Sequence, residues 1–227
     1  PIPEEYKTEG ESLQRYIRAA DLRISNMEST ISDYDQFAST YCGGSWLTVQ
    51  PYILDELDTF GFQYYSFANN HSMDYSYGGL LSTMKALEEH GVLHGGAGRS
   101  LAEATAPAVL EHEGQKVGVI SVTATCDDAA RAGDPSHKIP ARPGVNMLRH
   151  SETFAVNKAH MQALREIADA THINGRINNS KRGGYTIDNP DVFQLGSHFF
   201  TLSEEEGKRS TPHPDDVLRI VNAIRDA

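Results

Sequence analysis

The sequence predicts an α/β fold, because segments with strand and helix patterns alternate along the chain. Residues 62–68 form an apolar and aromatic run that is typical of a buried strand. Residues 76–90 follow with the apolar spacing of an amphipathic helix, and Gly91 provides a left-handed stop. Residues 92–94 then predict a further short strand. A strand, a helix and another strand in this order are the pattern of an open α/β sheet.

The composition limits the classes of function. The chain has 227 residues, which fits one large domain or one and a half, and 39% of them are hydrophobic, which is enough for a core. A formal net charge of −11 without a basic stripe argues against nucleic acid or an anionic membrane as a partner. No apolar run approaches the ~20 residues of a transmembrane helix. The two cysteines lack the spacing of a zinc site or a disulfide framework, so we expect free thiols.

The N-terminal part is expected to hold two elements. Residues 1–10 are polar and should be extended, and the apolar spacing of residues 11–20 predicts a helix. Residues 21–28 alternate like a strand and end in Asn26 and Glu28. A carboxylate at the end of a strand is a candidate ligand, and the alternative is an ordinary surface glutamate.

Turn residues divide the middle of the chain. Residues 33–45 read as a loop, and residues 51–59 read as a short helix that begins at a proline. The glycine-rich residues 95–98 resemble a phosphate-binding loop only in composition, so a tight turn is the better interpretation. Ser100 and Glu103 have the spacing of a capping box that starts another helix.

A β-hairpin and a long loop follow. Residues 108–112 and 116–123 flank a Glu-Gly pair, which predicts a hairpin, and the second strand is apolar enough to predict a central position in a sheet. Residues 127–149 predict a long loop that carries Arg142 and Arg149. On an acidic protein these two arginines indicate a cationic patch for an anionic substrate; the alternative is ordinary solvated arginines.

The C-terminal part is expected to contain two helices and two strands. Residues 156–170 predict an amphipathic helix, residues 174–189 a polar loop, and residues 192–202 two short strands. The final helix should begin at residues 211–212. Its apolar face lacks a sheet to cover, so we expect the sequence to be truncated.

The most informative stretch is the polar turn after the strand at residues 62–68. It places Asn70, His71 and Asp74 at the carboxyl edge of the predicted sheet, where open α/β folds bind their ligands. Imidazole and short oxygen side chains are ligands of divalent cations. The alternative is that His71 is a capping or core histidine.

Three motifs in this order resemble the CapA family, the poly-γ-glutamate capsule biosynthesis proteins, which are similar to calcineurin-like metallophosphoesterases. The resemblance covers about residues 13–164. The motifs are Arg-Ile-Ser-Asn-Met-Glu-Ser-Thr at residues 23–30, Phe-Ala-Asn-Asn-His-Ser-Met-Asp at residues 67–74 with Gly-Gly-Leu at 78–80, and Gly-Gly-Ala-Gly at residues 95–98 with Ala102, Ala104 and Pro107.

The resemblance implies a single domain over residues 1–227 with a four-layer α/β/β/α sandwich and a metal site. It implies that Glu28, Asn70 and His71 ligate a divalent ion of manganese, iron, zinc or magnesium. His71 would also be catalytic as a general acid, with Asp74 orienting its imidazole. Asn26 and Asn69 map onto the same two family motifs.

The resemblance also indicates the substrate and the cellular setting. The Arg-Pro-Gly-Val-Asn-Met-Leu-Arg stretch is similar to a family loop, which places Arg142, Asn146 and Arg149 near a substrate. The implied substrate is an anionic polymer or a phosphoester, and capsule-synthesis proteins are the implied partners. The residues alone predict no compartment, whereas the resemblance implies association with the bacterial cell envelope.

The sequence departs from the family pattern in two places, and these departures limit the function that the resemblance implies. The opening Gly-Asp motif would precede Pro1 and the later histidine motifs would follow Ala227, so we expect truncation at both ends and half of an active site. One hypothesis is a metal-dependent hydrolase, which cleaves a phosphoester or a γ-glutamyl amide. The other is a non-catalytic polymer-binding or export and assembly component.

Overall fold

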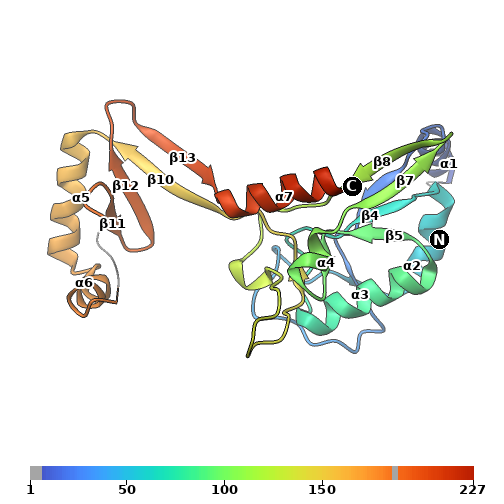
Figure 1. Ribbon diagram of the computed structural model, residues 1–227, viewed down its shortest axis with the longest axis horizontal. Helices are drawn as coiled ribbons and strands as arrows, with labels where there is room; N and C mark the ends of the chain where they lie inside the picture. Colours follow the sequence, from blue (N-terminus) through green and yellow to red (C-terminus); the bar gives the residue numbers. More distant parts are fainter. Residues whose placement is uncertain (1–6, 186–188) are drawn as a thin grey trace. The chain divides into compact units, whose positions relative to one another are not determined.

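A computed structural model describes residues 7–185 and 189–227 and forms a mixed α/β structure (Figure 1). The chain divides into two compact units: unit 1 holds residues up to 149 together with residues 214–227, and unit 2 holds residues 150–213. The α/β class is therefore confirmed, whereas the four-layer sandwich and the single domain stay predictions. The extended conformation expected for residues 1–6 lies outside the described residues, and residues 7–10 already belong to a helix.

Unit 1 is built on a three-stranded parallel sheet in the order β1-β4-β5. The strands are β1 (Ile24–Asn26), β4 (Tyr64–Ser66) and β5 (Leu93–Gly95). Asn26 pairs with Ser66, and Ser66 pairs with Gly95, so all three strands end at the same level. This register brings the polar residues that follow β1 and β4 to one edge of the sheet.

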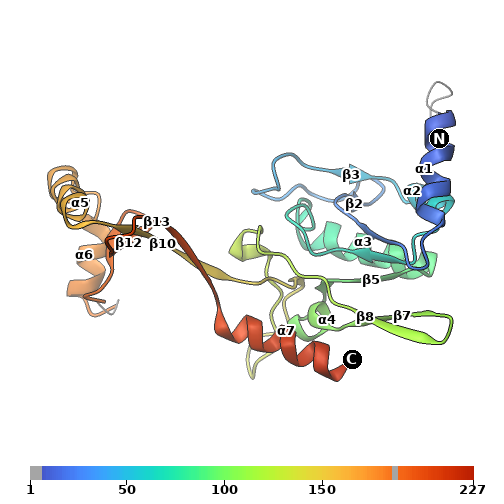
Figure 2. The same cartoon turned by 90° about the horizontal axis from the view of Figure 1, so that it is seen from above.

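Helices surround this sheet in unit 1. They are α1 (Lys7–Arg18), α2 (Ile53–Leu57), the 3-10 helix η2 (Asp58–Phe60) and α3 (Ser76–His90). The bounds of α3 match the prediction from sequence, and Gly91 ends it in a left-handed conformation with φ 77°. Figure 2 shows α3 running along β5, which it contacts.

The core of unit 1 lies between α3 and the sheet. Leu80, Met84 and Leu87 of α3 are fully buried against Tyr65 and Phe67. Burying each such side chain contributes about 1.5–3 kcal/mol relative to exposure. The Met and Leu stripe of this helix is therefore core packing, as its spacing predicts.

Short pairs of strands complete unit 1. Strand β2 (Thr30–Ile31) pairs in parallel with β3 (Thr48–Val49), and β6 (Ala97–Gly98) pairs antiparallel with β9 (Gly144–Val145). Helix α4 (Leu101–Thr105) begins at Ser100, whose hydroxyl accepts a hydrogen bond from Glu103 N at 3.1 Å. The predicted cap at Ser100 is thus confirmed.

The predicted hairpin is present, but its second strand is not central to a sheet. Strands β7 (Ala108–His112) and β8 (Gln115–Val119) form a two-stranded sheet. Glu113 and Gly114 both have positive φ, as a two-residue type I′ turn requires. Val117 is 40% exposed. An apolar, β-branched run specifies a strand, but the number of neighbouring strands depends on contacts distant in sequence.

The segment at residues 127–149 is largely irregular, as predicted. Its regular parts are the 3-10 helix η3 (Asp128–Ala130) and strand β9. The final helix α7 (Pro214–Asp226) returns to unit 1, where it contacts α4. Ala227, which follows this helix, lies against Gly118 of β8.

Unit 2 is a four-stranded sheet in the order β11-β12-β10-β13, with two helices. The elements are β10 (His150–Val156), α5 (Lys158–Thr171), α6 (Gly175–Arg182), β11 (Phe193–Leu195), β12 (His198–Leu202) and β13 (Gly207–Pro212). Helix α5 and the strands around Gly196 confirm the predicted order.

Two expectations for this part were wrong. Residues 175–182 form helix α6 instead of a loop; Lys181 and Arg182 in its last turn complement the helix dipole. Residues 186–188 of the expected loop lie outside the described residues. Residues 211–212 belong to β13 rather than to the final helix, because β13 pairs with β10 up to Pro212.

Two further observations concern the chain as a whole. Within the described ranges, every helix is too short or too polar to cross a membrane. Cys42 and Cys126 are free thiols, in agreement with the expectation from their spacing.

Candidate functional site

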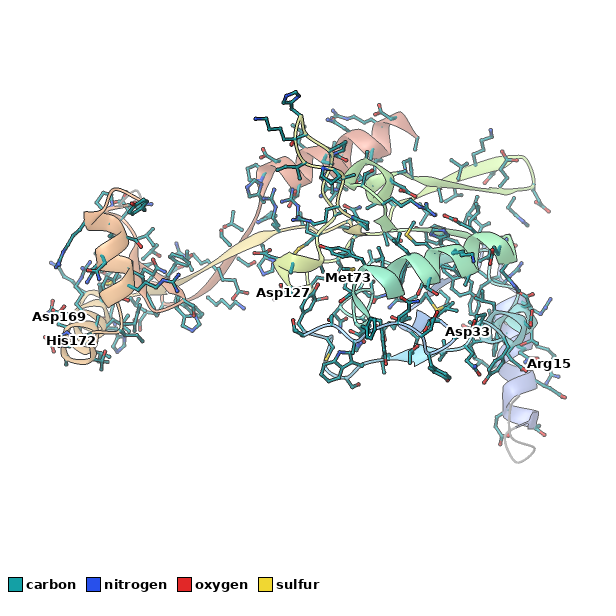
Figure 3. All side chains as sticks on the ribbon, turned by 90° about the horizontal axis from the view of Figure 1, so that it is seen from below. Arg15, Asp33, Met73, Asp127, Asp169 and His172 are labelled. Atoms are coloured by element: carbon teal, nitrogen blue, oxygen red, sulfur yellow. The ribbon has the colours of Figure 1, made fainter. Side chains whose placement is uncertain are left out.

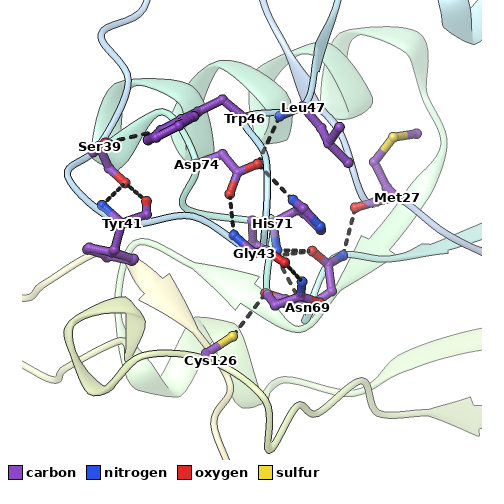
Figure 4. Close-up of polar contacts among 12 residues, drawn as sticks. Met27, Ser39, Tyr41, Gly43, Trp46, Leu47, Asn69, His71, Asp74 and Cys126 are labelled. Carbon is purple, nitrogen blue, oxygen red and sulfur yellow. Dashed lines mark hydrogen bonds and ion pairs between the residues drawn. The ribbon is translucent and has the colours of Figure 1, made fainter.

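The candidate site is the turn that follows β4 at the carboxyl edge of the sheet in unit 1 (Figure 4). The ladder continues one residue past the strands, because Met27 N donates to Ser66 O and Phe67 N donates to Gly95 O, each at 2.8 Å. The sheet therefore fixes the backbone at Phe67, directly before the turn, and at Met27 after the neighbouring strand β1.

The imidazole of His71 is held by a buried carboxylate. His71 Nδ1 lies 2.8 Å from Asp74 Oδ2, and Asp74 is fully buried. The same carboxylate accepts hydrogen bonds from Gly43 N at 3.1 Å and Leu47 N at 2.9 Å. A carboxylate that accepts from this ring fixes a proton on Nδ1 and leaves the lone pair of Nε2 for a ligand or a proton.

The amide of Asn69 joins the ends of β1 and β4. Its Nδ2 donates to Asn26 Oδ1 at 3.1 Å and to Met27 O at 2.8 Å, while its Oδ1 accepts from His71 N at 3.0 Å. Asn26 Nδ2 in turn donates to Glu28 Oε1 at 3.0 Å. Glu28 is exposed, but this chain of amides connects it to the turn that carries His71.

The loop at residues 33–45 lies over the site through Gly43. Asn70 Nδ2 donates to Gly43 O at 3.0 Å. A Cβ on Gly43 would lie 2.8 Å from His71 Nε2 and would also overlap Asn70 Nδ2. Gly43 thus lies close to His71 Nε2, and only a residue without a side chain fits there.

Cys126 and Tyr41 border the same edge. Cys126 Sγ donates to Asn69 O at 3.0 Å, and burial raises the pKa of the Cys126 thiol, which therefore stays protonated. Burial and the nearby Asp127 carboxylate raise the pKa of Tyr41, and the charge of Arg142 opposes them. Figure 3 labels Asp127 on the segment that follows Cys126.

The three residues predicted to bind substrate have different surroundings. Asn146 is fully buried; its Nδ2 donates to Ser121 O at 2.8 Å. Arg149 makes a bidentate ion pair with Asp216, at 2.8 Å and 3.1 Å. Arg142 is exposed near Tyr41. The substrate-binding role of all three stays a prediction, and Arg142 has the most accessible side chain.

A second group of possible metal ligands was missed by sequence reasoning. Asp55, Asp58 and His90 bring one ligand atom each to within 4.8 Å of one another, and they form the one such group of His, Cys, Asp or Glu in the described part of the chain. His90 Nε2 lies 3.0 Å from Asp58 Oδ2. Asp55 and Asp58 directly precede β4 in the chain, and His90 ends the helix that precedes β5. The group therefore lies at the amino ends of these strands, whereas His71 follows the carboxyl end of β4. No motif marks it, because α2, η2 and the end of α3 meet only in the fold.

The chain was compared with known proteins. Residues 4–187 match the family model described as "Bacterial capsule synthesis protein PGA_cap". Two curated relatives from Sinorhizobium fredii, the uncharacterized proteins y4sH and y4uA, are each 38% identical to this chain over 212 residues. Each match covers 92% of this chain and 44% of the relative, so the chain spans less than half the length of these proteins.

Proposed function

This chain belongs to the family of bacterial capsule synthesis proteins, and from this premise we propose that its His71 turn is part of a metal-dependent hydrolase site. The substrate is an anionic polymer or a phosphoester of the capsule or cell envelope. The observation that carries the proposal is the pairing of His71 Nδ1 with buried Asp74, which leaves Nε2 available for a metal ion or a proton.

The donor set fits a divalent cation. His71 offers Nε2, Asn70 offers Oδ1 because its Nδ2 is bound to Gly43 O, and Glu28 offers the carboxylate oxygen that Asn26 does not contact. One imidazole, one amide oxygen and one carboxylate are common ligands of manganese, iron, zinc or magnesium. Three protein ligands also leave positions open for water and substrate.

The residues of the turn perform separate tasks. When bound, a divalent ion lowers the pKa of a water molecule and polarises a phosphoryl or acyl oxygen. Asp74 holds the imidazole in one orientation and keeps the proton on Nδ1. His71 ligates through Nε2 or donates a proton from that atom to the leaving group. Gly43 lies close to Nε2 and limits the space for a ligand there, and a side chain at this position would remove that space.

The test compares His71→Ala with His137→Ala, an exposed histidine of the 127–149 segment. Elemental analysis and hydrolysis of a generic phosphodiester and of poly-γ-glutamate are measured on purified protein. We expect His71→Ala to lose bound metal and metal-dependent hydrolysis with an unchanged circular dichroism spectrum, whereas His137→Ala keeps both. Wild-type metal content and activity in His71→Ala would remove the assignment.

A second function is a non-catalytic component that binds the polymer or assembles with other capsule-synthesis proteins at the cell envelope. The observation in its favour is the Gly43 backbone, which occupies the space beside His71 Nε2. Purified protein that holds no metal and keeps its thermal stability in a chelator would favour this function over hydrolysis.

A further inference from the structure

Four arginines gather around one buried carboxylate in unit 1. Asp216 of α7 is 1% exposed, and it lies 2.8 Å from Arg149 Nε, 3.4 Å from Arg219 Nη2 and 3.9 Å from Arg131 Nη2. Arg142 joins the group, because its Nε donates to Arg131 O at 2.9 Å. Three guanidinium groups thus face one buried carboxylate and Arg142 lies beside them, while the carboxylates of Asp215 and Asp128 also act on Arg149.

Two of these arginines are fully engaged in holding the fold. Arg149 forms the bidentate pair with Asp216. Arg219 donates to Thr105 Oγ1 at 2.6 Å and to Met147 O at 2.8 Å. These contacts fix α7 to the rest of unit 1. Arg131 and Arg142 are less engaged among the described residues: Arg131 has the long ion pair with Asp216, and Arg142 has the hydrogen bond to Arg131 O.

The guanidinium group of Arg131 has few polar partners among the described residues. Its Nε is buried and has no hydrogen-bond partner among the described residues, and its ion pair with Asp216 is long at 3.9 Å. Burial and the charge of Arg149 lower the pKa of Arg131; the Asp216 carboxylate opposes this shift, and Arg219 and Arg142 add to it. A guanidinium that lies near like charges and has one nitrogen without an acceptor is stabilised by an added anion.

We propose that Arg131 and Arg142 bind an oxyanion, the carboxylate or phosphate group of an anionic polymer, with Arg149 and Arg219 adding positive potential. A guanidinium matches two oxygens of such a group in a bidentate arrangement. The identity of the polymer rests on the proposed function, whereas the binding of the oxyanion does not. This site assigns Arg131, which has no sequence motif of its own, to ligand binding.

The site is within reach of the His71 turn. Cys126 contacts Asn69 O at 3.0 Å, and Arg131 follows five residues later. Five residues span at most about 18 Å even when fully extended. An extended polymer that is held at Arg131 can therefore place a bond only a few repeats away at His71.

The experiment is a titration of chelator-treated protein with inorganic phosphate and, separately, with glutarate at low ionic strength. Calorimetry gives the Kd, and the Nε–Hε signals of arginine in NMR spectra report contact. We expect Arg131→Gln to weaken binding at least tenfold and Arg131→Lys to weaken it less. Arg225→Gln, at an exposed position of α7, should stay within twofold of wild type. The anion with the lower Kd identifies the natural group, a phosphate if inorganic phosphate binds more tightly and a carboxylate if glutarate does.

Thermal unfolding separates binding from a structural role. Without anions, Arg131→Gln should keep or raise the Tm, because it relieves repulsion; added phosphate or glutarate should raise the Tm of wild type only. The proposal is overturned if neither anion binds at millimolar concentration, or if Arg131→Gln binds like wild type. Should Arg131→Gln fail to fold, unchanged binding in the exposed variant Arg142→Gln overturns it.

The anion titration and the hydrolase assay of the wild-type protein together distinguish this proposal from the proposed function. Intact anion binding without any metal or hydrolysis in wild type would remove the hydrolase and keep the oxyanion site. Metal-dependent hydrolysis without anion binding at Arg131 would keep the hydrolase and remove the oxyanion site.

Discussion

The substitution Asp216→Asn tests how unit 1 holds its C-terminal helix. Asp216 is buried and accepts three hydrogen bonds from Arg149, from N at 2.9 Å, Nε at 2.8 Å and Nη2 at 3.1 Å. Asparagine keeps the shape of the side chain but removes the charge and one acceptor. Removing one partner of a buried ion pair costs about 3–5 kcal/mol. Here the partly buried Arg149, together with Arg219 and Arg131, would lose the carboxylate that they surround.

Urea unfolding followed by tryptophan fluorescence measures this loss. Trp46 is the only tryptophan and lies in unit 1, so its signal reports on the unit that holds Asp216. With an m-value of about 2.5 kcal/mol/M, a loss of about 4 kcal/mol lowers the urea midpoint by about 1.6 M. The exposed Asp226→Asn on the same helix is the control and should change stability by less than about 0.5 kcal/mol.

The pH dependence of stability gives a second readout for the same residue. Burial alone raises the pKa of Asp216, but the hydrogen bonds and charge of Arg149 outweigh it, and the pKa lies well below its ordinary value. The stabilisation is therefore present above the unfolded pKa of about 3.9 and is lost as the pH falls below it. Asp216→Asn should lack this acid-dependent part. A loss below about 1 kcal/mol at neutral pH would refute the reasoning, because it would show that the pair is solvated or replaceable.

Two further predictions concern Gly43 and His94. Gly43→Ala should displace the loop from His71, shift the imidazole NMR signals and destabilise unit 1 by about 1–3 kcal/mol, whereas Gly175→Ala, with open space around it, should be near neutral. Unchanged His71 signals would contradict the contact. Burial lowers the pKa of His94, so the unfolded chain gains a proton first and stability should fall as the pH drops through about 6.5. Urea midpoints at pH 7.5 and 5 should therefore differ more for wild type than for His94→Asn, and equal differences would refute the assignment.

Local features of the fold could be predicted from the sequence. Helix α3 has its apolar spacing, and Gly91 ends it within the same stretch of chain. The hairpin at Glu113 and Gly114 depends on two residues that accept positive φ. The turn with His71 and Asp74 is also local, because the two residues are three positions apart and their contact needs no other segment. The helix, the hairpin turn and the His71 turn each depend on residues that are close in sequence, so the sequence alone predicts them.

The tertiary structure decided the contacts between distant segments. Nothing in the sequence places Gly43 against His71, pairs Arg149 with Asp216, or leaves Arg131 Nε without an acceptor among the described residues. Strand β8 has the composition of a central strand, yet it pairs with β7 alone. Residue spacing determines helices, turns and caps because their hydrogen bonds are local. The neighbours of a buried charge or a sheet edge depend on packing across the whole unit, which no local pattern specifies.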